Sequence, residues 1–212
     1  RNFEYYSEDP LVSGLFTAAI TNGVQSHPGC GVTIKHYAAN NQEKRRQTCN
    51  SIIDERTLHE LYLRAFEIVV KNSNPVAIMT SYNRLNGEYV GASKKMITDI
   101  LREKWGFKGF VISDWGACIN AAVSLKAGMD LSMPDSYGYF DTALERALAD
   151  KIISESDIEA ANKRLLTSIM QMRDWDSKHT DRSIDYKEQH KIALELAEDS
   201  AILLKNENNT LP

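Results

Sequence analysis

The chain has 212 residues and is 42% hydrophobic and 25% charged, a composition typical of a globular domain of ordinary size. Its net charge of -4 is small, and no basic or acidic block stands out, so the charge pattern predicts no nucleic-acid partner and no membrane partner. The longest apolar runs, such as 110–112 and 201–204, are far too short to span a bilayer.

Short β-rich runs alternate with long helical patterns along the chain. The expected strands are 32–35, 76–80, 109–112 and a weaker 129–133. The expected helices are 9–25, 54–71, 93–105, 154–172 and 186–205. Asp54 is a candidate N-cap, 154–157 reads as a capping box, and Gly106 is a candidate C-cap. Within 54–71, the helical period places one apolar group on a single face: Leu58, Leu61, Tyr62, Ala65, Ile68 and Val69.

The order of these elements predicts the fold class. Strands that are apolar throughout suggest a parallel sheet, and strand–helix–strand repeats of this length suggest an α/β fold, either doubly wound or a (β/α)8 barrel. About four such units would make half a barrel. After Arg173 the composition turns polar, and 175–183 reads as a linker before the last helix. The charged run 43–46 reads as a solvated helix face.

Polar side chains follow the first three expected strands. The first ends in Lys35-His36, the second leads into Tyr82-Asn83, and the third, in "GFKGFVISDWGA", ends in Asp114-Trp115. The carboxyl ends of parallel strands are where α/β folds build their sites. Lys35 near Asp114 would favour an ionised carboxylate, and Trp115 offers an apolar platform for a sugar ring. This combination suits carbohydrate chemistry.

Each of these features also has a structural interpretation. Asp114 could be the N-cap of a helix beginning near Ala117. Lys35 and His36 could be an ion-pair residue beside a core histidine. Tyr82-Asn83, with Asn86-Gly87, could be part of a turn, because Asn-Gly is a strong turn signal. From the pattern alone, these alternatives remain open.

The cysteines and histidines argue against a metal centre. Cys30, Cys49 and Cys118 have no CxxC spacing, and the histidines lack ligand spacing to one another. Buried, inert thiols in a reducing compartment are the preferred interpretation, which slightly favours a cytoplasmic location. The sequence opens on Arg1 and ends on Pro212, and both ends are expected to be cuts within something larger.

Seven segments carry a resemblance to a known family. They are "RNFEYYSEDP", "KHYAANNQEKRR", "DERTLHELYLRAFE", "MTSYNRLNGEY", "LREKWGFKGFVISDWGA", "AGMDLSMP" and "AILLKNENNTLP". In this order and together, they make the chain similar to glycoside hydrolase family 3, in its β-glucosidase-like branch. The segment "KHYAANNQE" replaces the "KHFPGH"-like motif of the N-acetylglucosaminidase branch, so that branch is disfavoured.

The resemblance implies a fold and a reaction. Residues 1–172 would form the later part of a (β/α)8 TIM-like barrel, and 173–212 a linker and helix leading into an α/β sandwich domain. The reaction would be hydrolysis of β-linked glucosides or related β-glycosides with retention, releasing the terminal non-reducing sugar, without a metal or other cofactor. Asp114 would be the nucleophile. The remaining implied site residues bind the sugar or line its subsite, and they are Arg1, Lys35, His36, Met79, Tyr82 and Trp115.

Two parts of the family pattern have no counterpart in this sequence. The first part of the barrel, with its early sugar-binding aspartate, is missing, and so is the acid/base, which the resemblance places on a glutamate of the sandwich domain. The expected partners are therefore the missing barrel half and sandwich domain, or a second copy of the chain, besides the β-glycoside or oligosaccharide substrate. The runner-up is a carbohydrate-binding or scaffolding piece without turnover. A phosphate-handling barrel lyase is disfavoured, because "AGMDLSMP" offers little of a glycine-rich phosphate loop.

Overall fold

The computed structural model describes residues 5–27, 29–176 and 183–209 and divides the chain into two compact units, Arg1–Ser177 and Lys178–Pro212. The first unit holds the strands β1 (Thr33–Tyr37), β2 (Asn50–Ser51), β3 (Ala77–Thr80), β4 (Arg84–Leu85), β5 (Glu88–Tyr89) and β6 (Phe110–Ser113). Its helices are α1 (Pro10–Gln25), α2 (Glu55–Thr57), η1 (Leu58–Tyr62), α3 (Arg64–Ser73), η2 (Val90–Ala92), η3 (Lys95–Lys104), α4 (Ala121–Ala127), α5 (Tyr139–Ala149) and α6 (Glu155–Asp176). The second unit holds α7 (Tyr186–Asp199) and η4 (Glu207–Asn209).

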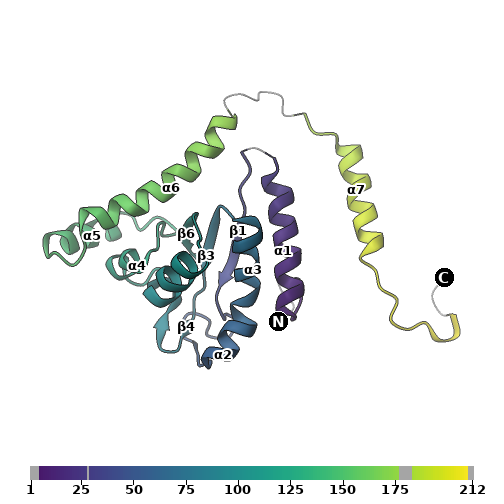
Figure 1. Ribbon diagram of the computed structural model, residues 1–212, viewed down its shortest axis with the longest axis horizontal. Coiled ribbons are helices and arrows are strands. Elements are labelled where there is room, and N and C mark those ends of the chain that lie inside the picture. The colour runs from purple at the N-terminus through teal and green to yellow at the C-terminus, as the bar shows by residue number, and fades with distance from the viewer. Residues whose placement is uncertain (1–4, 28, 177–182, 210–212) are drawn as a thin grey trace. The chain divides into compact units, whose positions relative to one another are not determined.

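A parallel sheet with the strand order β1-β3-β6 forms the centre of the first unit (Figure 1). The predicted strands 32–35, 76–80 and 109–112 are confirmed. The fourth, 129–133, is not a strand: Leu131 makes a single parallel bridge to Ile112. The side chain of Asp130 takes the amide hydrogen bond of Val111 at 2.7 Å, so a regular ladder does not continue there. The fold is α/β, with three regular parallel strands.

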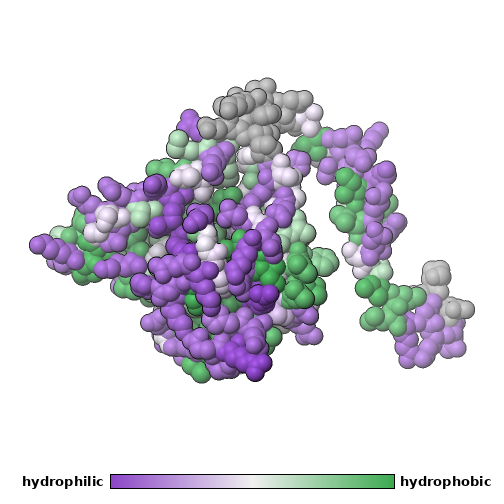
Figure 2. Space-filling view, in the orientation of Figure 1, coloured by the Kyte–Doolittle hydropathy of each residue, from purple (hydrophilic) through white to green (hydrophobic). Residues whose placement is uncertain are grey.

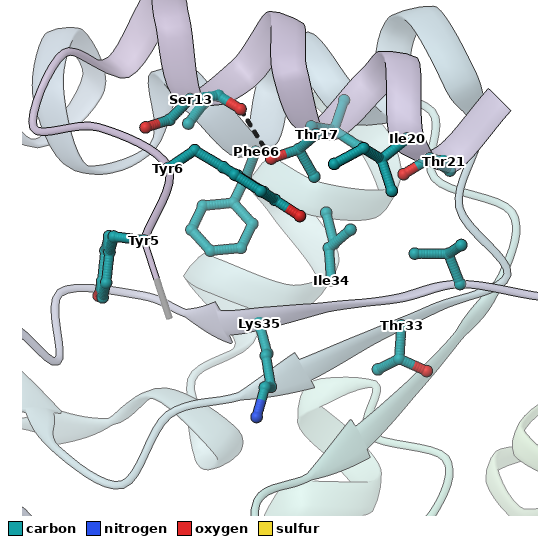
Figure 3. Close-up of a pocket in the computed structure, with 13 residues that line it drawn as sticks. Tyr5, Tyr6, Ser13, Thr17, Ile20, Thr21, Thr33, Ile34, Lys35 and Phe66 are labelled. Carbon is teal, nitrogen blue, oxygen red and sulfur yellow. Dashed lines mark hydrogen bonds between the residues drawn. The ribbon is translucent and has the colours of Figure 1, made fainter. Parts of the chain in front are cut away.

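The two faces of this sheet differ. Ile34, Ile78 and Val111 are paired neighbours across the three strands and are 5%, 0% and 0% exposed. Figure 3 shows Ile34 on the side of α1, whereas Lys35 extends to the opposite side. On that opposite face, Lys35 is exposed and Met79 is only half-buried. Helices therefore cover one face, and the other is open within the described residues.

The helix side holds the core and a cavity of about 430 Å³ between α1, α3 and β1 (Figure 3). The helices α1 and α3 pack against each other, and Gly14 of α1 lies against Ile68 of α3 with no room for a Cβ atom. Tyr37, fully buried at the end of β1, donates its hydroxyl to the Met96 carbonyl at 2.9 Å and so ties the sheet to η3.

The helix α1 also carries large apolar side chains that are more than half exposed. We call this the α1 apolar face, and its members are Leu11, Leu15 and Phe16, which are 52%, 52% and 59% exposed; the Tyr6 ring stacks against Phe16. Hydrophobic surface is visible over α1 in Figure 2. β1 pairs only with β3 among the described strands, so its other edge is unpaired. Both features lie on the same side of the unit.

The predicted helix signals are largely confirmed. Asp54 accepts from the Thr57 amide at 3.0 Å, and the amides of Ser154 and Asp157 are each bound by the other's side chain, the reciprocal pattern of a capping box. Gly106 follows η3 with a φ of 78°. The last helix is shorter than predicted and ends at Asp199.

The expected apolar face of 54–71 is partly wrong. A π-helical segment, η1, interrupts the α-helix and shifts the residues that follow it. Leu63 is consequently 0% exposed and lies in the core, whereas Leu61, which the regular period places inside, is 54% exposed. The helix expected to begin near Ala117 is α4, which begins at Ala121, and α5 was not among the predicted elements. Within the described residues, no helix is both long and apolar enough to cross a membrane.

The cysteines are free, but not all of them are buried. Cys118 is buried, Cys49 is half-buried and Cys30 is exposed. The expectation of three buried thiols is therefore wrong for Cys30, which lies in the loop between α1 and β1 rather than in an element with an apolar face.

Candidate active site

Asp114 lies directly after β6, at the carboxyl end of the parallel sheet. The preceding residue, Ser113, is held on both sides: its amide donates to the Leu131 carbonyl at 2.9 Å, and its Oγ accepts from the Met133 amide at 2.8 Å. Asp114 Oδ1 accepts from the Trp115 amide at 2.7 Å. Asp114 thus follows a strand end that is fixed by hydrogen bonds, and its side chain is 14% exposed.

His36 comes from β1 and reaches the same carboxylate. Its Nε2 lies 3.3 Å from Asp114 Oδ2, and its side chain is 10% exposed. Because β3 separates β1 from β6, this contact crosses the middle strand of the sheet. His36 is thus a largely buried histidine that contacts the carboxylate at the strand ends, and its role in sugar binding stays a prediction.

Tyr82 follows β3 and completes the group around Asp114. Its side chain is buried, and its hydroxyl donates to the Trp115 carbonyl at 2.8 Å. Burial, followed by the negative charge of Asp114, raises the pKa of the Tyr82 hydroxyl above its ordinary value of 10.0. Tyr82 is therefore a protonated hydrogen-bond donor at neutral pH.

The Asn-Gly signal identifies a turn, but that turn does not include Tyr82. Asn86 and Gly87 have φ angles of 50° and 99° and connect β4 to β5 as a two-residue hairpin, in which Leu85 pairs with Glu88. The turn prediction is confirmed for Asn86-Gly87.

Trp115 presents a large aromatic surface next to the carboxylate. It is 62% exposed, and Gly116 follows it in the left-handed region with a φ of 77° and donates to the Met133 carbonyl at 2.7 Å. Met79 pairs with Ile112 one residue before the strand end, on the open face of the sheet. Lys35 extends to the side of the sheet away from α1 (Figure 3).

The structure thus brings His36, Tyr82, Asp114 and Trp115 together, and it places Lys35 and Met79 on the open sheet face that leads to them. Arg1 lies outside the described residues. The alternative role for Asp114 as a helix cap is wrong, because α4 begins at Ala121 and its N-cap is Asn120, which accepts from the Val123 amide at 3.1 Å.

Arg46 is a site residue that the sequence analysis missed. Residues 44–48 form turns and not the expected helix face, and the Arg46 guanidinium lies 4.4 Å from the centre of the Tyr82 ring. Arg46 Nη1 also donates to Glu43 Oε2 at 2.7 Å. Arg46 is one of four consecutive charged residues, 43–46, and nothing in the sequence distinguishes it from the other three. Only the path of the loop from β1 to β2 brings it over Tyr82.

An α/β domain with polar side chains gathered at the carboxyl ends of its parallel strands has the arrangement of an α/β enzyme. The chain belongs to glycosyl hydrolase family 3, since the model described as "Glycosyl hydrolase family 3 N terminal domain" matches residues 1–168.

Two named relatives, a β-glucosidase and an arabinopyranosidase, are similar to the whole chain. The thermostable β-glucosidase B of Acetivibrio thermocellus is 42% identical over 212 residues, which are 100% of this chain and 28% of that protein. An exo-α-(1→6)-L-arabinopyranosidase of Bifidobacterium longum is 39% identical over 212 residues, again 100% of this chain and 28% of the relative. The chain therefore spans less than a third of the length of these relatives.

Solved structures agree with the computed fold. β-Glucosidase 3B from Thermotoga neapolitana, in complex with glucose, matches with a TM-score of 0.92 at 39% identity over 98% of this chain and 30% of that one. A β-glucosidase of Bifidobacterium adolescentis matches with a TM-score of 0.93 at 39% identity over 99% of this chain and 31% of its own.

Proposed function

We propose that this chain is the nucleophile-bearing part of a longer, retaining glycoside hydrolase that acts on β-glucosides and releases the terminal non-reducing sugar. The observation that carries the proposal is the position of Asp114, which is fixed at the end of β6 with His36 Nε2 3.3 Å away and Tyr82 and Trp115 beside it. β-Glucosidases at about 40% identity over the whole chain support the substrate class.

In the proposed reaction, an Asp114 carboxylate oxygen attacks the anomeric carbon and forms a covalent glycosyl–enzyme ester while the bond to the leaving oxygen breaks. The leaving oxygen takes a proton from a general acid, and water then hydrolyses the ester with the same group acting as base. The acid/base must stand about 5–5.5 Å from Asp114. We place it outside this chain, on the sandwich domain into which residues 173–212 would lead.

The sugar in the non-reducing terminal subsite would lie over the open face of the sheet. Lys35 and His36 would hold its hydroxyls, Arg1 would join them, and Met79 would form part of the floor. Trp115 would supply the apolar wall. Tyr82 donates its hydroxyl to the Trp115 carbonyl and would hold Trp115 in place beside Asp114.

The open sheet face and the α1 apolar face support the proposal that the chain is the later part of a (β/α)8 barrel. Further strands pairing with the free edge of β1 would close the barrel around Lys35 and Met79. Helices of the earlier part of the barrel would cover Leu11, Leu15 and Phe16. Exposed apolar faces of this size otherwise invite association with a second copy.

The direct test uses the full-length protein and p-nitrophenyl β-glucoside, with the anomer of the released glucose followed by proton NMR. We expect β-glucose to appear first and then to mutarotate, because double displacement retains configuration. Initial release of α-glucose would contradict the mechanism. Binding without release would favour the carbohydrate-binding alternative. Since an arabinopyranosidase is among the relatives, p-nitrophenyl α-L-arabinopyranoside belongs in the same assay.

Replacing Lys35 by alanine tests the sugar-binding role of the β1 end. We expect kcat/KM to fall by an amount equivalent to about 2–4 kcal/mol, because a charged hydrogen bond to a sugar hydroxyl that strengthens in the transition state is lost. The melting temperature should hardly change, since Lys35 extends away from the α1 side of the sheet, where the core lies. Steady-state kinetics and a thermal melt measure both.

Lys108→Ala is the matched control, because Lys108 is an exposed lysine that precedes β6 at the amino end of the sheet. It should leave kcat/KM unchanged. A large fall in melting temperature for Lys35→Ala, with full activity in the protein that stays folded, would instead assign Lys35 a structural role.

A further inference from the structure

The end of β1 departs from the regular pairing of the sheet at two of the candidate site residues. Ile34 pairs with Ile78, and Tyr37 pairs with Thr80. Three steps along β1 therefore correspond to two steps along β3, so β1 contains one extra residue between these pairs. Such a β-bulge changes the direction in which the neighbouring side chains point, and bulges are over-represented next to active sites.

The bulge decides which side chains of β1 enter the core. In a regular strand, side chains alternate between the two faces, so Ile34 and Tyr37 would lie on opposite faces. Both instead lie in the core on the helix side of the sheet. The two residues between them point elsewhere: Lys35 extends to the side away from α1 (Figure 3), and His36 contacts Asp114.

Side chains that follow β3 hold the backbone just beyond this bulge. The Ala38 carbonyl accepts hydrogen bonds from Ser81 Oγ at 3.0 Å and from Asn83 Nδ2 at 3.3 Å. The Ser81 amide donates to the Tyr37 carbonyl at 2.7 Å, and Asn83 Nδ2 also donates to the Arg84 carbonyl at 3.1 Å. These bonds are shielded from water, since Ala38, Ser81 and Asn83 are 0%, 2% and 1% exposed.

We propose that Ser81 and Asn83 are positioning residues for the hydrolytic reaction, and that by fixing the Ala38 carbonyl they hold His36 in the orientation in which its ring contacts Asp114. Ala38 is two residues beyond His36, so a shift of this carbonyl moves the backbone that carries the imidazole. This inference rests on the proposed function and adds two residues that act through His36 and not by touching the sugar.

A double-mutant cycle in the full-length protein tests whether the two residues act through His36. Ser81→Ala should lower kcat/KM for an aryl β-glucoside about threefold to tenfold, the effect of one neutral hydrogen bond, and Asn83→Ala should lower it by at least as much. In the His36→Ala background, each substitution should change kcat/KM by less than about twofold, because the imidazole that it positions is gone. Thermal melts of all variants measure stability separately.

Ser168→Ala is the matched control, because Ser168 is another buried serine whose Oγ donates to a backbone carbonyl, that of Arg164 in α6, at 3.2 Å. It should leave kcat/KM unchanged in both backgrounds. If Asn83→Ala does not fold, Ser81→Ala completes the cycle, because it removes only one hydroxyl and leaves the bond from Asn83 in place.

Three results would overturn the inference while the wild type remains active. The first is a full loss of kcat/KM from Ser81→Ala or Asn83→Ala in the His36→Ala background, because the two residues would then act independently of His36. The second is an unchanged kcat/KM in the folded single variants, whatever their melting temperature. The third is a His36→Ala enzyme with wild-type kcat/KM. A wild type that does not hydrolyse the glucoside would overturn the proposed function itself, and this inference with it.

Discussion

Replacing Asp114 by alanine in the full-length protein should lower kcat by roughly 10⁴–10⁶-fold, comparable to the loss of a nucleophile in other double-displacement enzymes. Without the carboxylate, no glycosyl–enzyme ester can form. The substitution should not unfold the protein, because the bonds that fix this strand end come from Ser113 and from the backbone of Gly116. Steady-state rates on an activated aryl β-glucoside and a circular dichroism spectrum measure the two effects.

Chemical rescue makes this prediction specific for a nucleophile. Azide can enter the space of the missing side chain and attack the anomeric carbon, so Asp114→Ala should form α-glucosyl azide, with inverted configuration. Asp99→Asn is the control, since Asp99 is an exposed carboxylate on η3 paired with Lys94. Labelling of the wild type with a 2-deoxy-2-fluoro glucoside should modify Asp114. A label on another carboxylate, together with normal turnover by Asp114→Ala, would refute the assignment.

Replacing Asp130 by alanine should destabilise the domain by about 3–5 kcal/mol, because it leaves two guanidinium groups and one buried amide without their partner. Its side chain is 0% exposed. Oδ2 accepts from Arg102 Nη2 at 2.6 Å and from the Val111 amide at 2.7 Å, and Oδ1 accepts from Arg164 Nε at 2.7 Å. The carboxylate therefore joins β6, η3 and α6.

Calorimetry of the full-length protein should show a lower melting temperature for the transition of this domain. Hydrogen exchange should speed up in the peptide that contains Val111, since its amide donates directly to Asp130. Asp130→Asn keeps an acceptor but loses the charge, and it should fall between the wild type and Asp130→Ala. Asp99→Asn should stay within about 0.5 kcal/mol of the wild type. An unchanged melting temperature in Asp130→Ala would show that the ion pairs contribute nothing net.

The three regular strands could be predicted because each is a short β-branched or apolar run bounded by turn residues, and such runs have few alternatives in an α/β chain. The π-helical segment η1 could not be predicted, because one extra residue in a helical turn does not alter the composition of the segment. It alters only which side chains point inward. For this reason Leu61, which was expected on the buried face, is 54% exposed, whereas Leu63, which was not, is 0% exposed. The run 129–133 was predicted to be a strand because most of its residues are apolar. It is not one, because the side chain of Asp130, and not a backbone carbonyl of this run, accepts the hydrogen bond of the Val111 amide.

The candidate site was predictable where its residues follow strands directly. His36 and Asp114 stand at strand ends, and parallel strands bring such positions to one rim. Arg46 was not predictable, because it reaches Tyr82 through the path of a loop, which depends on tertiary contacts far along the chain. Arg1 lies outside the described residues, and its role stays a prediction. The roles of the other site residues in binding and catalysis also stay predictions, and they are Lys35, His36, Met79, Tyr82, Asp114 and Trp115.

The contact between His36 and Asp114 has a consequence for how the site assembles. β1 and β6 lie on opposite edges of β3, so their backbones are two strand spacings apart, about 9.6 Å, yet the two side chains approach to 3.3 Å above the end of the middle strand. The contact between these two side chains can form only when β1, β3 and β6 are all paired in their native register. Catalytic competence should therefore emerge late in refolding and all at once, and a partly paired sheet with native-like secondary structure would still be inert.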